Sequence, residues 1–290
     1  MFSHIQPGPP DPMFTLKKKA DNDTSPEKVD LGVGIYRSES GKYQELEAVR
    51  RYESTIGDAE FLHLAAGVMF GESNEALTSG RTISGTGANS LGALLISKTM
   101  QPKPKVFIGV PTWGNHVPIF QDAGLETATY PYLDSSKHSV DFDGILKAVR
   151  SAPKGSVFVF QGCCHNPTGV DLDGEQWQKL AVEMKAHSHL PFFDTAYQGL
   201  GDGLDEDSAG VQVFVASGIE FFVCQSFSKN FALYGERCGA LHVVGKTKEV
   251  ASNVQDRLRS LIRHTYSSSP AYGSRLVKIT LSTESMRGDW

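Results

Sequence analysis

The chain has 290 residues, a length that corresponds to roughly two domains or to one large domain with appendages. Its composition, 40% hydrophobic and 21% charged, is that of a soluble globular protein and disfavours a disordered or fibrous chain. The net charge of −5 argues against broad attraction to nucleic acid or to an anionic membrane, because both attract clustered Lys and Arg. We therefore expect chemistry on small molecules, with no nucleic-acid partner and no membrane partner.

The cysteines and the start of the chain indicate the compartment. The chain has four cysteines, Cys163, Cys164, Cys224 and Cys238, and no two of them have the C-x-x-C spacing. They lie in or beside apolar stretches, where a free Cys is usually a small buried hydrophobe, so we expect a reducing compartment without disulfides. Residues 1–12 have neither an apolar signal core nor an Arg-rich amphipathic pattern. No stretch approaches the roughly 20 apolar residues of a spanning helix, and the prediction is a cytoplasmic protein.

The N-terminal thirty residues are rich in proline and then in polar residues. Four prolines within residues 7–12 precede a polar run over residues 17–28, a pattern typical of an arm that lies over another part of the protein. Further along, the small residues 84–88 are predicted to form a loop. The apolar residues 91–96 that follow predict a helix whose N-terminus is left open.

Four short apolar runs are typical of strands that are buried on both faces. They cover residues 106–110, 156–160, 191–193 and 221–224. Helical spacing is found at Trp177, Leu180, Ala181 and Met184, and again at Val250, Val254, Leu258 and Leu261. The alternation of strand and helix predicts an α/β domain with a mostly parallel sheet that is covered on both faces. Residues 282–290 are expected to stop without a closing element.

Polar and aromatic residues follow each predicted strand. In α/β sheets, ligands gather at the carboxyl ends of the strands. The four motifs, in chain order, are Thr112-Trp113-Gly114-Asn115-His116, His165-Asn166-Pro167-Thr168-Gly169, Asp194-Thr195-Ala196-Tyr197 and Ser226-Phe227-Ser228-Lys229-Asn230. Each motif alone has a structural explanation, such as a tight turn at Asn166-Pro167 or a helix cap at Asp194. Together, in this order, they indicate a functional site.

These motifs resemble those of the aspartate aminotransferase branch of the fold-type I pyridoxal-phosphate (PLP) enzymes. Two further motifs carry the resemblance, Leu31-Gly32-Val33-Gly34-Ile35-Tyr36-Arg37 and Tyr234-Gly235-Glu236-Arg237-Cys238-Gly239-Ala240. The resemblance implies a three-layer α/β/α large domain with a mostly parallel sheet. It implies that residues 1–41 form an arm and the start of a small domain, and that residues 42–290 form the PLP-binding large domain. The C-terminal small domain would be absent and the small domain incomplete.

The resemblance also implies roles for single residues. Lys229 would hold the cofactor aldehyde and then carry a proton between substrate and cofactor. Asp194 would pair with the protonated pyridine nitrogen and so keep the ring an electron sink. Tyr197, together with Asn166, would hydrogen-bond the ring hydroxylate, while Trp113 would stack on the ring. The catalytic residues would therefore be Lys229, Asp194 and Tyr197, and no metal ion is expected.

The remaining implied roles concern the phosphate and the substrate. Backbone N–H groups and hydroxyls at a helix start, together with an arginine, suit a phosphate. The implied phosphate ligands are Ser84, Gly85, Thr86, Ser226, Ser228, Arg237 and Tyr52 of a second subunit. The implied substrate ligands are Gly34, Trp113, Asn166 and Arg263, where Arg263 would reach across a dimer interface to a distal carboxylate. The prediction is a homodimeric PLP-dependent aminotransferase acting on an amino acid, aspartate or glutamate first, and a 2-oxo acid.

Three departures from the family pattern leave an alternative open. The family has a further helix-length segment between the positions of Arg51 and Tyr52, and it commonly has a histidine where this chain has Gln161. The chain ends at Trp290, before the arginine that binds the substrate α-carboxylate in the family. The alternative is a shortened paralogue that binds PLP without turnover.

Two other classes of site are weaker interpretations. Ser226-x-x-Lys229 could be an acylating serine site, but the S-D-N and K-T-G partners of such enzymes do not occur, and the nearest string is Gly245-Lys246-Thr247-Lys248. A dinucleotide site at Gly85-Thr86-Gly87 lacks the third glycine at the required spacing. The amino donor stays open, because relatives with the matching arginine also accept aromatic amino acids.

Overall fold

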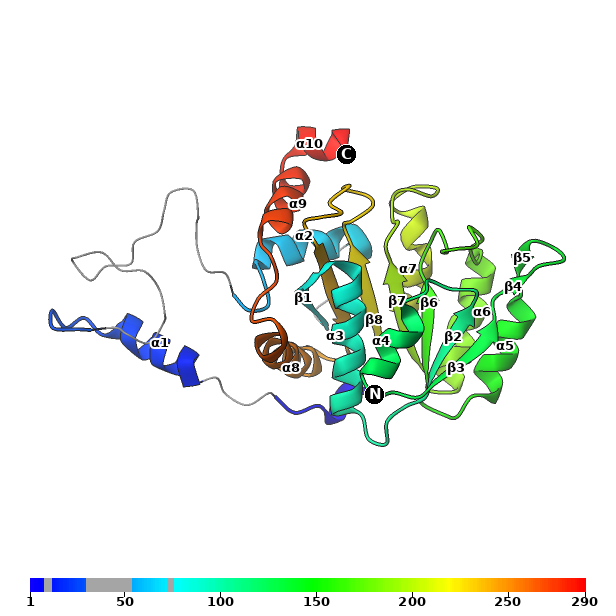
Figure 1. Cartoon of the computed structure of the whole chain (residues 1–290), viewed down its shortest axis with the longest axis horizontal. Helices are drawn as coiled ribbons and strands as arrows, with labels where there is room; N and C mark the ends of the chain where they lie inside the picture. The colour runs from blue at the N-terminus through cyan, green and yellow to red at the C-terminus, as the bar shows by residue number, and fades with distance from the viewer. Residues whose placement is uncertain (8–11, 30–53, 72–75) are drawn as a thin grey trace.

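The computed structural model describes residues 1–7, 12–29, 54–71 and 76–290. In this part of the chain, a seven-stranded sheet in the order β1-β9-β8-β7-β6-β2-β3 is flanked by helices on both faces (Figure 1). Its strands are β1 (Leu77–Ile83), β2 (Val106–Val110), β3 (Thr127–Pro131), β6 (Val157–Gln161), β7 (Leu190–Thr195), β8 (Phe221–Ser226) and β9 (Cys238–Val244). A separate pair consists of β4 (Leu133–Asp134) and β5 (Ser139–Val140).

Helices connect the strands. The α-helices are α1 (Pro12–Asn22), α2 (Ala59–Phe70), α3 (Ser84–Thr99), α4 (His116–Asp122), α5 (Phe142–Ser151), α6 (Gly174–Ala186), α7 (Ala209–Ser217), α8 (Lys248–Thr265), α9 (Tyr272–Ser282) and α10 (Glu284–Asp289). Short 3-10 helices are η1 (Phe2–His4) and η2 (Glu206–Ser208). None of these described helices combines the length and apolar character that a membrane crossing needs.

The sheet is mostly parallel, as predicted. Strands β3, β2, β6, β7 and β8 pair in parallel, while β9 runs antiparallel to both of its neighbours, β8 and β1. Successive side chains of β7 and β8 alternate between two cores, because strand side chains point to opposite faces. Phe192 and Phe222 face the core that includes α3 and α8, and Phe193 and Phe221 face the core that includes α5, α6 and α7. This burial on both faces explains the continuous apolar runs in the sequence.

Two local predictions were wrong. Residues 84–88 are not a loop, because α3 begins at Ser84, immediately after β1. The backbone makes this tight junction at Ser84, whose φ is +59°, and small side chains allow the first turn of the helix to lie close to the sheet. Residues 282–290 do not lack a final element, since α10 covers most of them. Trp290 closes that helix against the loop after β8, stacking on Phe231 with ring centroids 4.6 Å apart.

The first residues lie against the core. Phe2 is almost fully buried and its ring meets the ring of Phe222 edge to face at 5.3 Å. Side chains of α8 hold the backbone that follows, because Asn253 donates to the carbonyl of Ile5 and Arg257 donates to that of Gln6. The N-terminal segment is thereby fixed beside α8, and the rest of α8 covers the sheet.

Phe214 gives a test of the second core. This fully buried residue of α7 has four aromatic neighbours, Phe160, Trp177, Phe193 and Phe221. We expect Phe214→Ala to lower the free energy of unfolding by about 3–5 kcal/mol, since it removes a buried ring and leaves a cavity. Denaturant unfolding measures this loss. The control Val182→Ala, at a side chain that is 67% exposed, should change stability by no more than about 0.5 kcal/mol. A loss below about 1 kcal/mol in Phe214→Ala would contradict this description of the core.

Candidate active site

A cavity of about 210 Å³ opens at the carboxyl ends of the parallel strands. It is lined by Ser84, Gly85, Thr86, Trp113, Gln161, Asn166, Asp194, Ala196, Tyr197, Ser226, Ser228, Lys229, Tyr234 and Arg237. This set contains every predicted site residue except Gly34, Tyr52 and Arg263. It also contains Gln161, Ala196 and Tyr234, for which the sequence analysis gave no site role. The motifs meet here because neighbouring parallel strands end at the same edge of the sheet.

Three serine hydroxyls and one arginine line one end of the cavity. Ser84 Oγ lies 2.7 Å from Ser228 Oγ and 3.1 Å from Ser226 Oγ. Arg237 donates from Nη1 to Ser228 Oγ at 3.4 Å and to the carbonyl of Tyr234 at 2.9 Å. These groups surround the first turn of α3, and the N-terminal end of a helix, with its exposed N–H groups and helix dipole, favours an anion. The arrangement therefore has the donors and the charge that bind a phosphate group.

Gly85 allows the close approach at this end. A Cβ atom on Gly85 would lie 3.0 Å from Ser226 Cβ, which is tighter than ordinary contact, and 3.9 Å from Asp194 Oδ1. A side chain here would push α3 away from β8 and would enter the cavity. The absence of a side chain is thus what leaves the helix start open to a ligand.

Asp194 forms the floor of the cavity. It is the fifth residue of β7 and is 8% exposed. His116 Nε2 lies 3.0 Å from its Oδ2, and the other ring nitrogen of His116, Nδ1, lies 2.7 Å from Thr112 Oγ1. The ring of His116 is fully buried and meets the ring of Trp113 edge to face. One carboxylate oxygen is therefore engaged from behind, and the second lies towards the start of α3 on the cavity side.

Lys229 lies on the loop between β8 and β9. Its Nζ is 4.7 Å from the centroid of the Tyr234 ring and 6.0 Å from that of Tyr197. The next residue, Asn230, is held on both sides, because its side chain donates to the carbonyl of Gln198 and its own carbonyl accepts from Trp290 Nε1. The loop presents a primary amine near two aromatic rings, in the cavity that the carboxylate of Asp194 also lines.

The comparisons with known proteins agree with this geometry. Residues 26–290 match the family described as aminotransferase class I and II. The chain belongs to this family.

Aminotransferase tasG of Hapsidospora irregularis is 47% identical over 97% of this chain and 79% of its own length. The mitochondrial aspartate aminotransferase of Gallus gallus is 38% identical over the whole of this chain and 73% of its own length. The fold also matches an aromatic-amino-acid aminotransferase from Burkholderia pseudomallei covalently bound to pyridoxal phosphate, with a TM-score of 0.81, 37% identity, and coverage of 100% of this chain and 77% of that one.

The described structure places Arg263 away from the cavity and does not cover two other predicted site residues of this aminotransferase. Gly34 and Tyr52 fall outside the described residues. Arg263 is exposed near the C-terminus of α8, where its Nη1 donates to Ser267 Oγ at 2.6 Å. Within a single copy of the aminotransferase it does not reach the cavity, so its predicted role requires a second subunit.

The loop after β6 presents Asn166 to the cavity. The carboxylate of Asp171 accepts hydrogen bonds from the backbone N–H groups of Cys164 and His165 and so fixes the turn. His165 stacks on Tyr132 with ring centroids 3.8 Å apart, and its Nδ1 lies 2.9 Å from Thr168 Oγ1. Burial lowers the pKa of His165 to about 4. The imidazole is therefore neutral near pH 7.

This lowered pKa of His165 predicts a pH dependence of stability. Between about pH 6.5 and pH 4 the unfolded chain binds a proton that the folded chain does not, so the free energy of unfolding falls as the pH falls. The slope from this residue is at most about 1.4 kcal/mol per pH unit. Urea unfolding at pH 7 and pH 4.5 should show a smaller pH dependence in His165→Phe, which keeps the stack on Tyr132. An unchanged difference between the two pH values would contradict the assignment.

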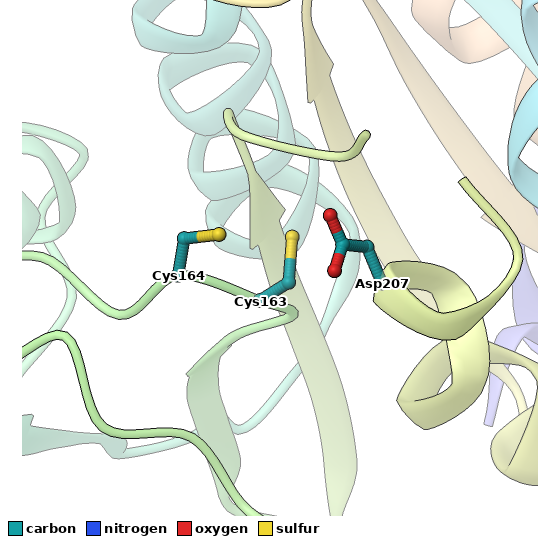
Figure 2. A group of neighbouring side chains, drawn as sticks. All are labelled: Cys163, Cys164 and Asp207. Atoms are coloured by element: carbon teal, nitrogen blue, oxygen red, sulfur yellow. The ribbon is translucent and has the colours of Figure 1, made fainter. Parts of the chain in front are cut away.

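Two cysteines and an aspartate form a compact cluster beside this loop (Figure 2). The sulfur atoms of Cys163 and Cys164 and a carboxylate oxygen of Asp207 lie within 4.8 Å of one another. The carboxylate of Asp207 already accepts three backbone N–H groups, those of Gly199, Gly201 and Asp202. Burial raises the pKa of both thiols, and the charge of Asp207 raises it further. Within this cluster, the carboxylate of Asp207 therefore holds the turn at residues 199–202.

Proposed function

We propose that this aminotransferase uses pyridoxal phosphate to move an amino group between aspartate or glutamate and a 2-oxo acid. The single observation that carries the proposal is the cavity in which the Lys229 amine, the Asp194 carboxylate and the Ser84, Ser228 and Arg237 donors face one space. The donor set fits the cofactor, because it offers an amine for an aldehyde, a carboxylate for a pyridinium and a cationic cradle for a phosphate.

When bound, the cofactor supplies an electron sink for the bond that breaks at the substrate Cα. The chain's own residues do the rest. Lys229 would hold the cofactor covalently and, once released, its Nζ would move the proton from the substrate Cα. Asp194 would pair with the ring nitrogen. Asn166 and Tyr197 would hydrogen-bond the ring hydroxyl, and the half-buried Trp113 would stack on the ring.

The substrate class and the assembly belong to the same proposal. Aspartate and glutamate are supported by the similarity to the aspartate aminotransferase of Gallus gallus and by the predicted match of Arg263 to a carboxylate-binding arginine. Because Arg263 is exposed and outside the cavity, the proposal includes a homodimer in which Arg263 and Tyr52 serve the neighbouring site. It also takes residues 42–290 as the cofactor-binding large domain and residues 1–41 as an arm and the start of a small domain. The cytoplasmic location stays a prediction, because the Gallus gallus relative is a mitochondrial enzyme.

A coupled assay tests the proposal. The purified chain, supplied with pyridoxal phosphate, is expected to convert aspartate and 2-oxoglutarate to oxaloacetate and glutamate, and to do so faster than it uses phenylalanine. Colour from bound cofactor with no turnover of any amino donor would instead support the inactive PLP-binding paralogue. The match of this chain to the aminotransferase family, and its similarity to two aminotransferases, favour the active enzyme.

A further inference from the structure

Gln161 connects the two sides of the proposed cofactor site. It is the last residue of β6 and is half-buried on the wall of the cavity. Its Oε1 accepts from the backbone N–H of Asn166 at 2.8 Å, and its Nε2 donates to the carbonyl of the same residue at 2.8 Å. The Nε2 group also donates to Thr112 Oγ1 at 3.5 Å. One amide thus holds the Asn166 backbone on both sides and contacts the chain of hydrogen bonds that leads to Asp194.

The direction of this hydrogen-bond chain follows from donor and acceptor chemistry. A backbone N–H only donates and a backbone carbonyl only accepts, so the two bonds to Asn166 fix which end of the Gln161 amide is oxygen and which is nitrogen. The nitrogen can only donate, and Thr112 Oγ1 therefore accepts from it. Among the described residues, the acceptor that the structure provides for the hydroxyl proton of Thr112 is His116 Nδ1, 2.7 Å away, so Nδ1 is assigned as the unprotonated ring nitrogen. His116 Nε2 consequently carries the ring proton and donates a hydrogen bond to Asp194 Oδ2.

We propose that Gln161 is a positioning residue that keeps His116 in the neutral Nε2–H form. In this form, His116 gives Asp194 one hydrogen bond and no positive charge, so the carboxylate keeps its charge for the ring nitrogen of the cofactor. A charged imidazole would share that carboxylate and weaken its pairing with the cofactor. The consequence for the cofactor rests on the proposed function, whereas the state of His116 is a property of the protein alone.

The isosteric change Gln161→Glu is expected to reverse the direction of the hydrogen bonds that run from residue 161 through Thr112 to His116. A carboxylate has no proton to donate, so the hydroxyl of Thr112 turns towards it and presents only lone pairs to His116 Nδ1. His116 then gains a proton on Nδ1 while Nε2 still faces Asp194. The titratable groups near the ring include Asp194 on β7, His165 on the loop after β6, and Tyr130 and Tyr132, which line a small cavity together with His116. The variant replaces none of them.

The test is nitrogen NMR of the cofactor-free protein labelled with 15N in histidine, at pH 7.5. The His116 signals are identified by their loss in His116→Asn. We expect the wild-type ring to have one protonated nitrogen, Nε2, and one unprotonated nitrogen, Nδ1, and Gln161→Glu to lose the unprotonated signal. The control Gln121→Glu makes the same change on α4, the helix of His116, at an exposed amide that also donates to a threonine hydroxyl. It should leave both signals unchanged.

Thr112→Val removes the hydroxyl that links Gln161 to His116 and leaves the hydrogen bonds between Gln161 and Asn166 in place. Combined with Gln161→Glu, it should restore the unprotonated Nδ1 signal, and alone it should shift that signal because its donor is lost. With pyridoxal phosphate added, Gln161→Glu should bind the cofactor about tenfold more weakly than Gln121→Glu does, which is the scale of losing an orienting partner. A doubly protonated His116 in the wild type, or the same His116 spectrum in the wild type, Gln161→Glu and Thr112→Val, would overturn the proposal. Because the spectra need no cofactor, a failure of the proposed function would not change this outcome.

Discussion

Replacing Lys229 by alanine is expected to lower kcat/KM for amino transfer by about 10⁴-fold, the upper end of what a positioned general base contributes. Lys229 is the primary amine of the cavity and lies over the rings of Tyr234 and Tyr197. Its replacement removes both the covalent attachment point and the group that moves the Cα proton. The phosphate end of the cavity is unchanged, so the variant should still bind the cofactor, although without covalent attachment. Steady-state assays and equilibrium dialysis with pyridoxal phosphate measure the two effects.

The matched control is Lys246→Ala, at an exposed lysine between β9 and α8. It should retain wild-type kcat/KM, since it lies outside the cavity. If Lys229→Ala kept more than about a tenth of the wild-type rate, another group would have to carry the proton, and the assignment of Lys229 would be wrong.

Replacing Asp194 by asparagine is expected to lower kcat by about 10²–10³-fold, or about 3–4 kcal/mol in the activation free energy. The variant keeps the shape of the side chain. Its amide oxygen would turn to accept from His116 Nε2, as Asp194 Oδ2 does now, and the amide N–H₂ would then face the cavity. A donor would meet the protonated ring nitrogen of the cofactor, so the stabilisation of the electron sink would be lost. Single-turnover kinetics with aspartate separate this effect on chemistry from product release.

Asp205→Asn is the control for this change, at an exposed aspartate that caps η2 without a side-chain hydrogen bond. It should leave kcat unchanged. Equal rates for Asp194→Asn and the wild type would mean that Asp194 holds His116 for structural reasons only.

The fold could be predicted where the sequence pattern reports burial on both faces. The runs at 106–110 and 156–160 lie on β2 and β6, with β6 displaced by one residue, and the short runs at 191–193 and 221–224 lie inside β7 and β8. These last two strands extend to Thr195 and Ser226, because the sheet continues pairing after the apolar residues end. The edge strand β1 could not be recognised from its pattern, since it contains Thr78, Ser79 and the fully buried Arg81. Arg81 is tolerated there because it donates to Ser269 and Ser274, contacts far away in the sequence.

The sequence motifs predict which residues gather at one cavity, because each motif follows its strand directly. His116, Gln161 and Tyr234 received no site role from the sequence, although a signal existed for each. His116 ends the motif that begins at Thr112, Gln161 was visible as a departure from the family pattern, and Tyr234 lies five residues after Lys229. Their positions depend on contacts between segments that are far apart in the sequence, such as the bond from His116 to Asp194, which spacing along the chain does not reveal.

The most direct test of the account is the location of covalently held cofactor. The purified chain is incubated with pyridoxal phosphate, reduced with borohydride to make any attachment permanent, digested, and mapped by mass spectrometry. The proposed role of Lys229 predicts one pyridoxyl phosphate group, on the peptide that contains Lys229, and none in Lys229→Ala. Modification spread over exposed lysines such as Lys246, or the same extent of labelling in Lys229→Ala, would contradict it.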